Sequence, residues 1–180
     1  MEEERVAIFI DGSNLYYILK KMFRNKRLSS FDFKKFCRYL VGKRQLTRIY
    51  YYNSPLDRKK DLRKYQQQQK FFDKLKWIPN FNLILCRMQK IKIDGKVIYQ
   101  VKEDDIHLAV DMVEFASNDF YDTAVLISSD GDFVPAIKAV KRFGKTVENV
   151  GFEIKFSYHL KKECDEFRML KISEVEQFFD

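Results

Sequence analysis

Two short apolar segments of this chain each run into aspartate and glycine, and this feature constrains the fold more than any other. Residues 124–127 are apolar and are followed by Ser-Ser-Asp-Gly-Asp, which ends at Asp132. Residues 6–10 are apolar and lead directly into Asp11-Gly-Ser-Asn14. Short apolar runs bounded by turn residues are typical of buried strands. Parallel α/β proteins place their chemistry at the carboxyl ends of such strands, so the sequence predicts an acidic site there.

The rest of the chain alternates between strand-like and helix-like segments. The predicted strands are 5–10, 46–52, 82–88, 123–128, 146–150 and 166–170. The predicted helices begin at Ser13 or Asn14, at Ser30 or Asp32, and near residues 57, 106, 133 and 157. Asp94-Gly95 between 89–93 and 96–101 predicts a β-hairpin, because Asp-Gly supplies the positive φ of a tight turn. We therefore expect one α/β domain over residues 1–180, with a mainly parallel sheet, helices on both faces and an added hairpin.

Composition excludes several classes of protein. No apolar run is long enough to span a membrane, and the acidic start of the chain is unlike a signal peptide. The three cysteines, Cys37, Cys86 and Cys164, are far apart and fit buried thiols in a reducing compartment. With only two histidines, a His-rich metal site is not expected. We expect a cytoplasmic protein without a membrane segment.

Charge is unevenly distributed along the chain, whose net charge is +8. Residues 20–48 hold eleven Lys or Arg against one Asp, whereas residues 103–132 hold nine Asp or Glu and no Lys or Arg. Basic side chains that hold phosphates, opposite carboxylates that hold a metal, form the charge plan of a nuclease. The alternative is that the lysines form solvated helix faces. That alternative does not explain the uncompensated acids.

The aspartates at the two strand ends converge if those strands are neighbours in the sheet. Asp105 and Asp111, from the acidic helix, are further candidates. On a regular helix they lie about 120° apart and do not share a face. If Asp105 is the N-cap, the helical spacing does not apply to it, and both Asp105 and Asp111 can point toward the strand ends. The competing candidate is Asp104, which lies seven residues before Asp111 and therefore on nearly the same side of the helix. The residues alone leave this choice open.

The alternative for Asp11-Gly12 is a simple turn and helix cap. Asp111 argues against a purely structural reading, because its neighbours are apolar and no Lys or Arg lies within its segment. Oxygen ligands of this kind suit Mg²⁺ or Mn²⁺, which position a phosphodiester and lower the pKa of a bound water. Asn14 is placed to orient water or phosphate. Ser128 and Ser129 either cap the strand end or hydrogen-bond a phosphate or an aspartate.

Three blocks of this chain resemble the NYN domain, LabA-like branch, of the PIN-like nucleases. They are Asp11-Gly-Ser-Asn14, Lys102-x-x-Asp105-Ile-x-Leu-Ala-x-Asp111 and Ser128-x-Asp130-Gly-Asp132-Phe-x-Pro135. The resemblance implies a Rossmann-like, PIN-like three-layer fold and metal-dependent cleavage of RNA. It also implies a catalytic and metal-binding set, with Asp105 preferred over Asp104: Asp11, Asp105, Asp111, Asp130 and Asp132, with Asn14 beside them.

Two positions depart from the family pattern. Glu103 stands where the family usually has glycine, and Ser129 replaces the first glycine of Ser-Gly-Asp-Gly-Asp. We expect Ser129 to narrow the approach of a substrate backbone. We expect Glu103 and Asp104 to add negative charge at the mouth of the site, which either weakens RNA binding or supplies a further ligand. Every matched carboxylate is nevertheless present, so we expect an active site.

The expected partner is single-stranded RNA, and a homodimer is plausible although no interface stripe is evident. The basic residues expected to hold RNA are Lys20, Lys21, Arg24, Arg87, Lys102 and Lys138. Tyr16, Tyr17 and Phe133 either stack unpaired bases or belong to the core. The rival functions are an RNA-binding or regulatory module with little turnover and another phosphoryl-transfer enzyme. Toprim and haloacid-dehalogenase sites fit less well, because Asp11 and Ser13 stand where those sites need other residues.

Overall fold

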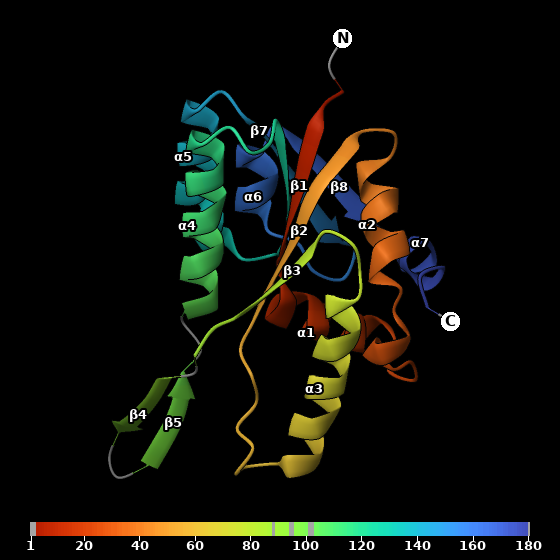
Figure 1. The fold of residues 1–180 in the computed structure, drawn as a ribbon, viewed down its shortest axis with the longest axis vertical. Coiled ribbons are helices and arrows are strands. Elements are labelled where there is room, and N and C mark those ends of the chain that lie inside the picture. The colour runs from red at the N-terminus through yellow and green to blue at the C-terminus, as the bar shows by residue number, and fades with distance from the viewer. Residues whose placement is uncertain (1–2, 88, 94–95, 101–102, 180) are drawn as a thin grey trace.

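The structure is a computed structural model that describes residues 3–87, 89–93, 96–100 and 103–179, with side chains for 3–87 and 103–179. Six strands form one sheet in the order β3-β2-β1-β6-β7-β8, and all five pairings are parallel (Figure 1). The strands are β1 (Arg5–Asp11), β2 (Gln45–Asn53), β3 (Phe81–Leu85), β6 (Thr123–Ile127), β7 (Thr146–Phe152) and β8 (Glu166–Leu170).

Helices cover both faces of this sheet. They are α1 (Gly12–Met22), α2 (Phe33–Val41), α3 (Leu62–Lys76), α4 (Glu103–Ser117), α5 (Val134–Arg142), α6 (Tyr158–Glu163) and α7 (Ile172–Glu176), with short 3-10 turns η1 (Leu28–Ser30) and η2 (Gly131–Phe133). Figure 1 shows α4, α5 and α6 on one side of the sheet and α1, α2, α3 and α7 on the other. The expected three-layer α/β fold is confirmed, and the sheet is parallel throughout.

The alternation of β1 shows how one strand serves both layers. Val6, Ile8 and Ile10 pack into a cluster with α1, α2, α3 and α7. Ala7 and Phe9 pack into a second cluster with α4, α5 and α6. Because successive side chains of a strand point to opposite faces, a fully apolar strand is buried on both sides. β1 is such a strand, and it lies between β2 and β6 near the centre of the sheet.

The predicted hairpin forms a separate two-stranded antiparallel sheet of β4 (Gln89–Ile93) and β5 (Lys96–Gln100). In Figure 1 it extends below the main sheet, on the side of α4. The Asp94-Gly95 turn that motivated this prediction lies outside the described residues. The two strands pair in the register that such a turn requires, with Ile93 opposite Lys96.

Several predicted helix boundaries were wrong. Asp11 caps α1, rather than Ser13 or Asn14, because its side chain accepts a hydrogen bond from the backbone N–H of Asn14. α4 begins at Glu103 instead of residue 106, since its three leading acids favour the positive end of the helix dipole. α3 begins at residue 62, after the capping Asp61, rather than near residue 57. The short α7 and η1 were not predicted.

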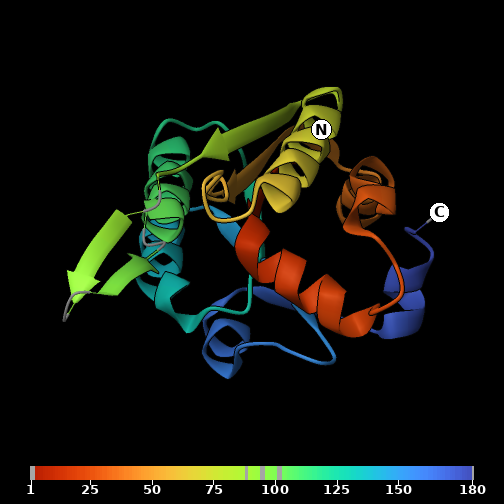
Figure 2. The ribbon, with the colours of Figure 1, turned by 90° about the horizontal axis from the view of Figure 1, so that it is seen from below.

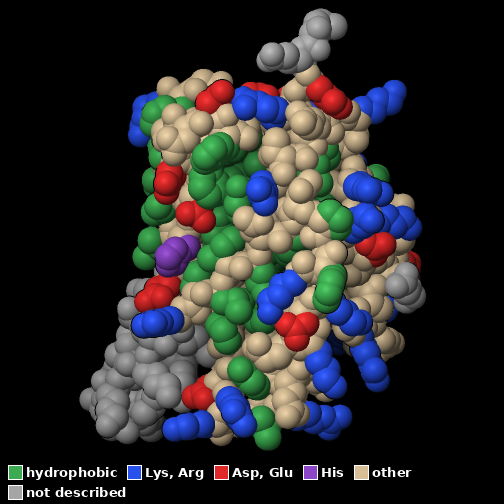
Figure 3. Space-filling model, viewed as in Figure 1, with side chains coloured by type: hydrophobic (Ala, Val, Ile, Leu, Met, Phe, Trp, Pro, Cys, Tyr) green, Lys and Arg blue, Asp and Glu red, His purple; other side chains and the backbone are tan. Residues whose placement is uncertain are grey.

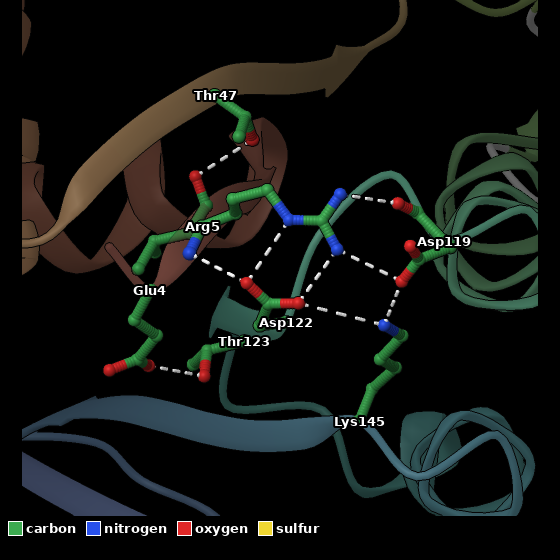
Figure 4. Close-up of polar contacts among 8 residues, drawn as sticks. Glu4, Arg5, Thr47, Asp119, Asp122, Thr123 and Lys145 are labelled. Carbon is green, nitrogen blue, oxygen red and sulfur yellow. Dashed lines mark hydrogen bonds and ion pairs between the residues drawn. The ribbon is translucent and has the colours of Figure 1, made fainter. Parts of the chain in front are cut away.

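Ion pairs tie the amino ends of the strands together. The Arg5 guanidinium binds both oxygens of Asp122, at 3.1 Å and 2.7 Å, and also contacts Asp119 (Figure 4). Lys145 pairs with the same two aspartates. Beside them, Arg44 pairs with Glu148. At this edge of the sheet, each of these carboxylates faces a cation.

The three cysteines are buried thiols, as expected. Cys37, Cys86 and Cys164 are all free and buried. Within the part of the chain that the structure describes, no helix combines the length and the apolar character needed to cross a membrane.

Candidate acidic active site

A cavity of about 310 Å³ opens at the carboxyl ends of β1 and β6. The chain leaves β1 toward β2 on one side and reaches β6 on the other, so this is the point at which the strand order reverses. Ligands of open α/β sheets bind in the crevice at such a switch point. We call this the acidic cavity; its lining residues are Asp11, Ser13, Asn14, Tyr17, Asp104, Asp105 and Asp130.

Asp11 is both the last residue of β1 and the N-cap of α1. One carboxylate oxygen accepts a hydrogen bond from the N–H of Asn14 at 2.9 Å, and the other accepts from Ser128 Oγ at 3.0 Å. The residue is only 6 % exposed. The carboxylate is therefore held in one orientation by donors from two different segments.

Gly12 allows the chain to turn sharply after Asp11. A Cβ atom at this position would lie 2.4 Å from a ring carbon of Tyr51 and 2.6 Å from the carbonyl oxygen of Tyr52. Neither atom has room to retreat, because both tyrosines are buried in β2. The close approach of α1 to β2 thus requires glycine.

The loop after β6 is tied to α1 by hydrogen bonds. Asn14 Oδ1 accepts from both the N–H and the hydroxyl of Ser129, at 3.2 Å and 3.0 Å. Ser128 Oγ accepts from the N–H of Asp130 at 3.1 Å. From β7, the buried Asn149 side chain donates to the carbonyl of Ser128 at 3.0 Å. These bonds fix the position from which Asp130 enters the cavity.

The first turn of α4 brings two carboxylates to the cavity. Asp104 is 4 % exposed, and the Ser13 hydroxyl lies 3.4 Å from its Oδ2. Asp105 is half-buried and lines the same cavity. Because α4 begins at Glu103, Asp105 lies inside the helix and is not its N-cap. Both neighbouring acids face the site, including Asp104, which the family resemblance had set aside.

Asp111 and Asp132 do not line the cavity. Asp111 lies two helical turns beyond Asp104, a distance of about 10 Å along the axis. Its Oδ2 accepts a hydrogen bond from the Tyr52 hydroxyl at 2.8 Å. Asp132 is exposed in η2, and its N–H donates to Asp130 Oδ1 at 2.9 Å. The structure thus gathers Asp11, Asp105 and Asp130 and leaves the other two outside.

The pKa values of three cavity carboxylates, Asp11, Asp104 and Asp105, are raised. Burial, reinforced by the charges of Asp104 and Asp130, raises the pKa of Asp11 to about 6. Burial and the neighbouring aspartates raise the pKa of Asp105 to about 7, and burial raises the pKa of Asp104. Among the described residues, no Lys or Arg forms an ion pair with these four carboxylates. No described Lys or Arg therefore offsets the removal of these charges from water.

The donor set suits a hard divalent cation. Carboxylate, hydroxyl and amide oxygens surround the cavity, and Mg²⁺ and Mn²⁺ prefer oxygen ligands. Among the described residues, no three His, Cys, Asp or Glu side chains lie close enough together to hold a metal ion directly. A Mg²⁺-like ion that keeps several waters needs only one or two direct carboxylate ligands.

The basic residues that were expected to hold RNA are scattered around this end of the sheet. Lys20, Lys21 and Arg24 are exposed on and just after α1. Arg87 is exposed after β3, and Lys138 lies 3.7 Å from Glu163. Lys102 lies outside the described residues. In the space-filling view, Lys and Arg gather over α2 and α3, away from the α4 side (Figure 3).

The three aromatic candidates separate into two groups. Phe133 is 2 % exposed and belongs to the core. Tyr16 and Tyr17 are 38 % and 69 % exposed, and Tyr17 lines the acidic cavity. Sequence periodicity alone does not separate them, since the difference depends on which sides of α1 and of η2 face the core.

The NYN domain family model matches residues 5–171. The chain belongs to the NYN domain family. NYN domains are a nuclease-like family of the PIN superfamily, which fits an acidic cavity at the switch point of a parallel sheet. The family match spans β1 to β8 and thus every element that builds the cavity.

Two proteins and one solved structure are similar to this chain. The "Low amplitude and bright protein LabA" of Synechococcus elongatus is 26 % identical over 98 % of this chain and 88 % of its own length. The uncharacterized protein MJ0482 of Methanocaldococcus jannaschii is 39 % identical over 39 % of this chain, and the match spans 28 % of that protein. A protein of unknown function from Vibrio parahaemolyticus, VPA0982, shares the fold with a TM-score of 0.70 and 22 % identity, covering 94 % of this chain and 96 % of that structure.

Proposed function

We propose that this chain is a Mg²⁺- or Mn²⁺-dependent ribonuclease that hydrolyses phosphodiester bonds at the acidic cavity. The observation that supports this most is the set of four cavity carboxylates without a cationic partner among the described residues. Such a cluster destabilises the fold unless a cation binds there. Nuclease-like family membership makes a phosphodiester the natural substrate.

In this proposal, one or two of Asp11, Asp105 and Asp130 would bind the metal directly and the rest would hold it through its waters, with Asp104 as a further candidate. A bound divalent ion lowers the pKa of a water and neutralises charge on the leaving oxygen. Asn14 holds the loop that carries Asp130, through Ser129. Asp111 and Asp132 lie outside the cavity. Asp132 contributes negative charge, which helps to raise the pKa of Asp105, and we assign Asp111 a supporting part through Tyr52.

The proposed substrate is RNA, in single-stranded form. Basic side chains near the cavity would hold its phosphates, chiefly Lys20, Lys21 and Arg24, while Arg87, Lys102 and Lys138 are secondary candidates. Phosphate contacts of this kind supply affinity that does not depend on sequence. A homodimer and a cytoplasmic location stay predictions.

The test is cleavage of an end-labelled, mixed-sequence single-stranded RNA in Mn²⁺, Mg²⁺ or EDTA. Asp130→Asn should lose cleavage by about 100-fold or more, as expected when a charge-stabilising group of an active site is removed. Asp122→Asn, at the opposite end of the sheet, is the matched control and should cleave like the wild type. Products that persist in EDTA, or equal cleavage by a folded Asp130→Asn protein, would refute the proposal. RNA binding without cleavage would favour a regulatory binding module.

A further inference from the structure

Helix α1 joins the acidic cavity to an open surface. Seen from below the sheet, α1 runs from the end of β1 across this face, and no other helix covers it (Figure 2). Its buried side, which includes Leu15, Ile18 and Leu19, packs on the sheet. The opposite side faces solvent and begins at the cavity.

Tyr17 is a large side chain on this open side that also lines the cavity. It lines the cavity and is 69 % exposed, so the ring contributes little to the core. Its ring contact is with Tyr16, edge to face, at a centroid distance of 5.5 Å. One face of an aromatic ring next to a phosphodiester-cleaving site is thus available to a ligand.

Cations follow Tyr17 along the same side. Lys20 and Lys21 stand three and four residues later, which places them about 5 to 6 Å further along the helix axis and on the same side. Arg24 follows just after the end of α1. All three side chains are exposed, and none forms an ion pair with a described carboxylate. Lys20 lies 5.8 Å from the centre of the Tyr16 ring.

The helix dipole accounts for only part of this arrangement. Cations in the last turn of a helix are favourable on their own. The dipole does not account for an exposed aromatic ring at the cavity, one turn before those cations. An aromatic face followed by a row of cations is the pattern with which proteins bind single strands, where bases stack and phosphates pair with Lys or Arg.

We propose that Tyr17 is a stacking platform for one unpaired base beside the cleaved phosphate, and that the strand continues along α1 over Lys20, Lys21 and Arg24. This inference rests on the proposed function, because it uses the acidic cavity as the point of cleavage. A paired base is stacked on both sides and offers no face to Tyr17. The substrate at the site is therefore a single-stranded segment, and duplex RNA is excluded.

The test measures binding rather than cleavage, by fluorescence anisotropy in the Asp130→Asn background with Mg²⁺. The probe is a labelled 12-nucleotide single strand, in which one abasic nucleotide is moved along the sequence. At one position the abasic nucleotide should weaken binding by about 5- to 150-fold, the usual effect of losing one stacked base. Adding Tyr17→Ala should weaken binding of the intact strand by the same factor and remove the abasic effect. Tyr17→Phe should retain the abasic effect, and Trp77→Ala, which removes an exposed ring just after α3, is the matched control.

The cationic part of the surface is tested by salt dependence. Neutralising Lys20, Lys21 and Arg24 to Gln should reduce the slope of log affinity against log salt by about 2, since each contact on a single strand contributes about 0.7. The matched control changes Lys43, Lys76 and Arg142, which lie near the amino ends of strands. An unchanged slope in the first variant, or an equal change in both, would refute the path along α1.

The outcomes separate this inference from the proposed nuclease activity. Metal-dependent cleavage by the wild type, together with a Tyr17→Ala variant whose abasic profile is unchanged, would overturn the platform alone. Absence of cleavage, together with a position-specific abasic effect that depends on Tyr17, would overturn the nuclease and leave the platform. Equal affinity for blunt duplex and single strand would also contradict the platform.

Discussion

At its amino end, β6 is preceded by Asp122, whose carboxylate is held by Arg5, whereas at the carboxyl ends of the strands Asp11, Asp105 and Asp130 face one another. The hydrogen bonds of Arg5 lower the pKa of Asp122 to about 2. Burial raises the pKa of Asp11 to about 6. An aspartate side chain therefore stabilises the fold at the amino end of the sheet, at Asp122, and destabilises it at the carboxyl end, at Asp11. A carboxylate that raises the free energy of the fold is a better indicator of function than one that is paired.

The acidic cavity is the smaller of two cavities at opposite ends of the sheet. The amino end holds a larger cavity, of about 530 Å³, lined in part by Arg44, Glu148 and Lys145. Its charges pair with one another, as in the contacts of Arg44 with Glu148 and Glu4. Asp122 and Glu148 there both lie in ion pairs, whereas no described Lys or Arg pairs with Asp11. The balance of charge, rather than the volume, distinguishes the two ends.

The largest expected effect is an opposite response to one isosteric change. In metal-free protein at pH 7.5, Asp11→Asn should raise the free energy of unfolding by about 1–3 kcal/mol, because the amide carries no buried charge. Its oxygen still caps α1. Asp122→Asn should lower the free energy of unfolding, because it removes the ion pair with Arg5. The loss should be only about 1 kcal/mol, because that ion pair is partly exposed. Thermal or urea unfolding measures both, and changes of the same sign would break the comparison.

The second expected effect is a difference in pH dependence. The pKa of Asp11 is raised in the folded state, so its contribution to stability is fully present below about 4 and is lost as pH rises through about 6. Asp105 extends this loss to about 7. The pKa of Asp122 is lowered, so its contribution is present above about 4 and is lost as pH falls through about 2. Urea unfolding from pH 2 to 8 should show the advantage of Asp11→Asn growing only above pH 4, and an advantage independent of pH would contradict this.

The smallest expected effect concerns how the cavity loop is held. Neutral hydrogen bonds fix this loop, whereas ion pairs fix the amino end. Ser129→Ala removes the hydroxyl bond to Asn14 and keeps the backbone bond, so unfolding should become easier by about 1 kcal/mol or less. Ser117→Ala, which removes an exposed hydroxyl bond within α4, is the control. If the proposal is right, only the first variant should weaken cleavage.

The sequence predicted the parts of the site that depend on strand ends. Apolar runs that stop at Asp11 and before Asp130 placed both residues at one edge of the sheet, and β1 and β6 are indeed neighbours. The last strand, Glu166–Leu170, has the predicted bounds. β1 and β6 were predictable because a strand buried on both faces leaves a continuous apolar signal that ends where the strand ends.

The parts that depend on packing between helices and strands were not predictable. Asp111 has no Lys or Arg nearby in sequence, but its partner is the hydroxyl of Tyr52, a neutral donor from β2. Asp104 turns inward because α4 begins three residues earlier than its apolar periodicity suggests. The seven-residue spacing between Asp104 and Asp111 did indicate that both lie on one side of the helix, the side that faces the sheet. Side-chain donors from other elements leave no mark in local sequence.

The two hydrogen bonds that hold Asp11 have a consequence for how tightly a ligand binds. A surface carboxylate loses rotamer freedom when it captures an ion, and that loss weakens binding. The Asp11 side chain loses this freedom when the chain folds, because the N–H of Asn14 and the hydroxyl of Ser128 already fix both its oxygens. A cation that bound here would therefore meet lone pairs whose directions are already fixed. The entropy of ordering this side chain is lost when the chain folds and not when a ligand binds.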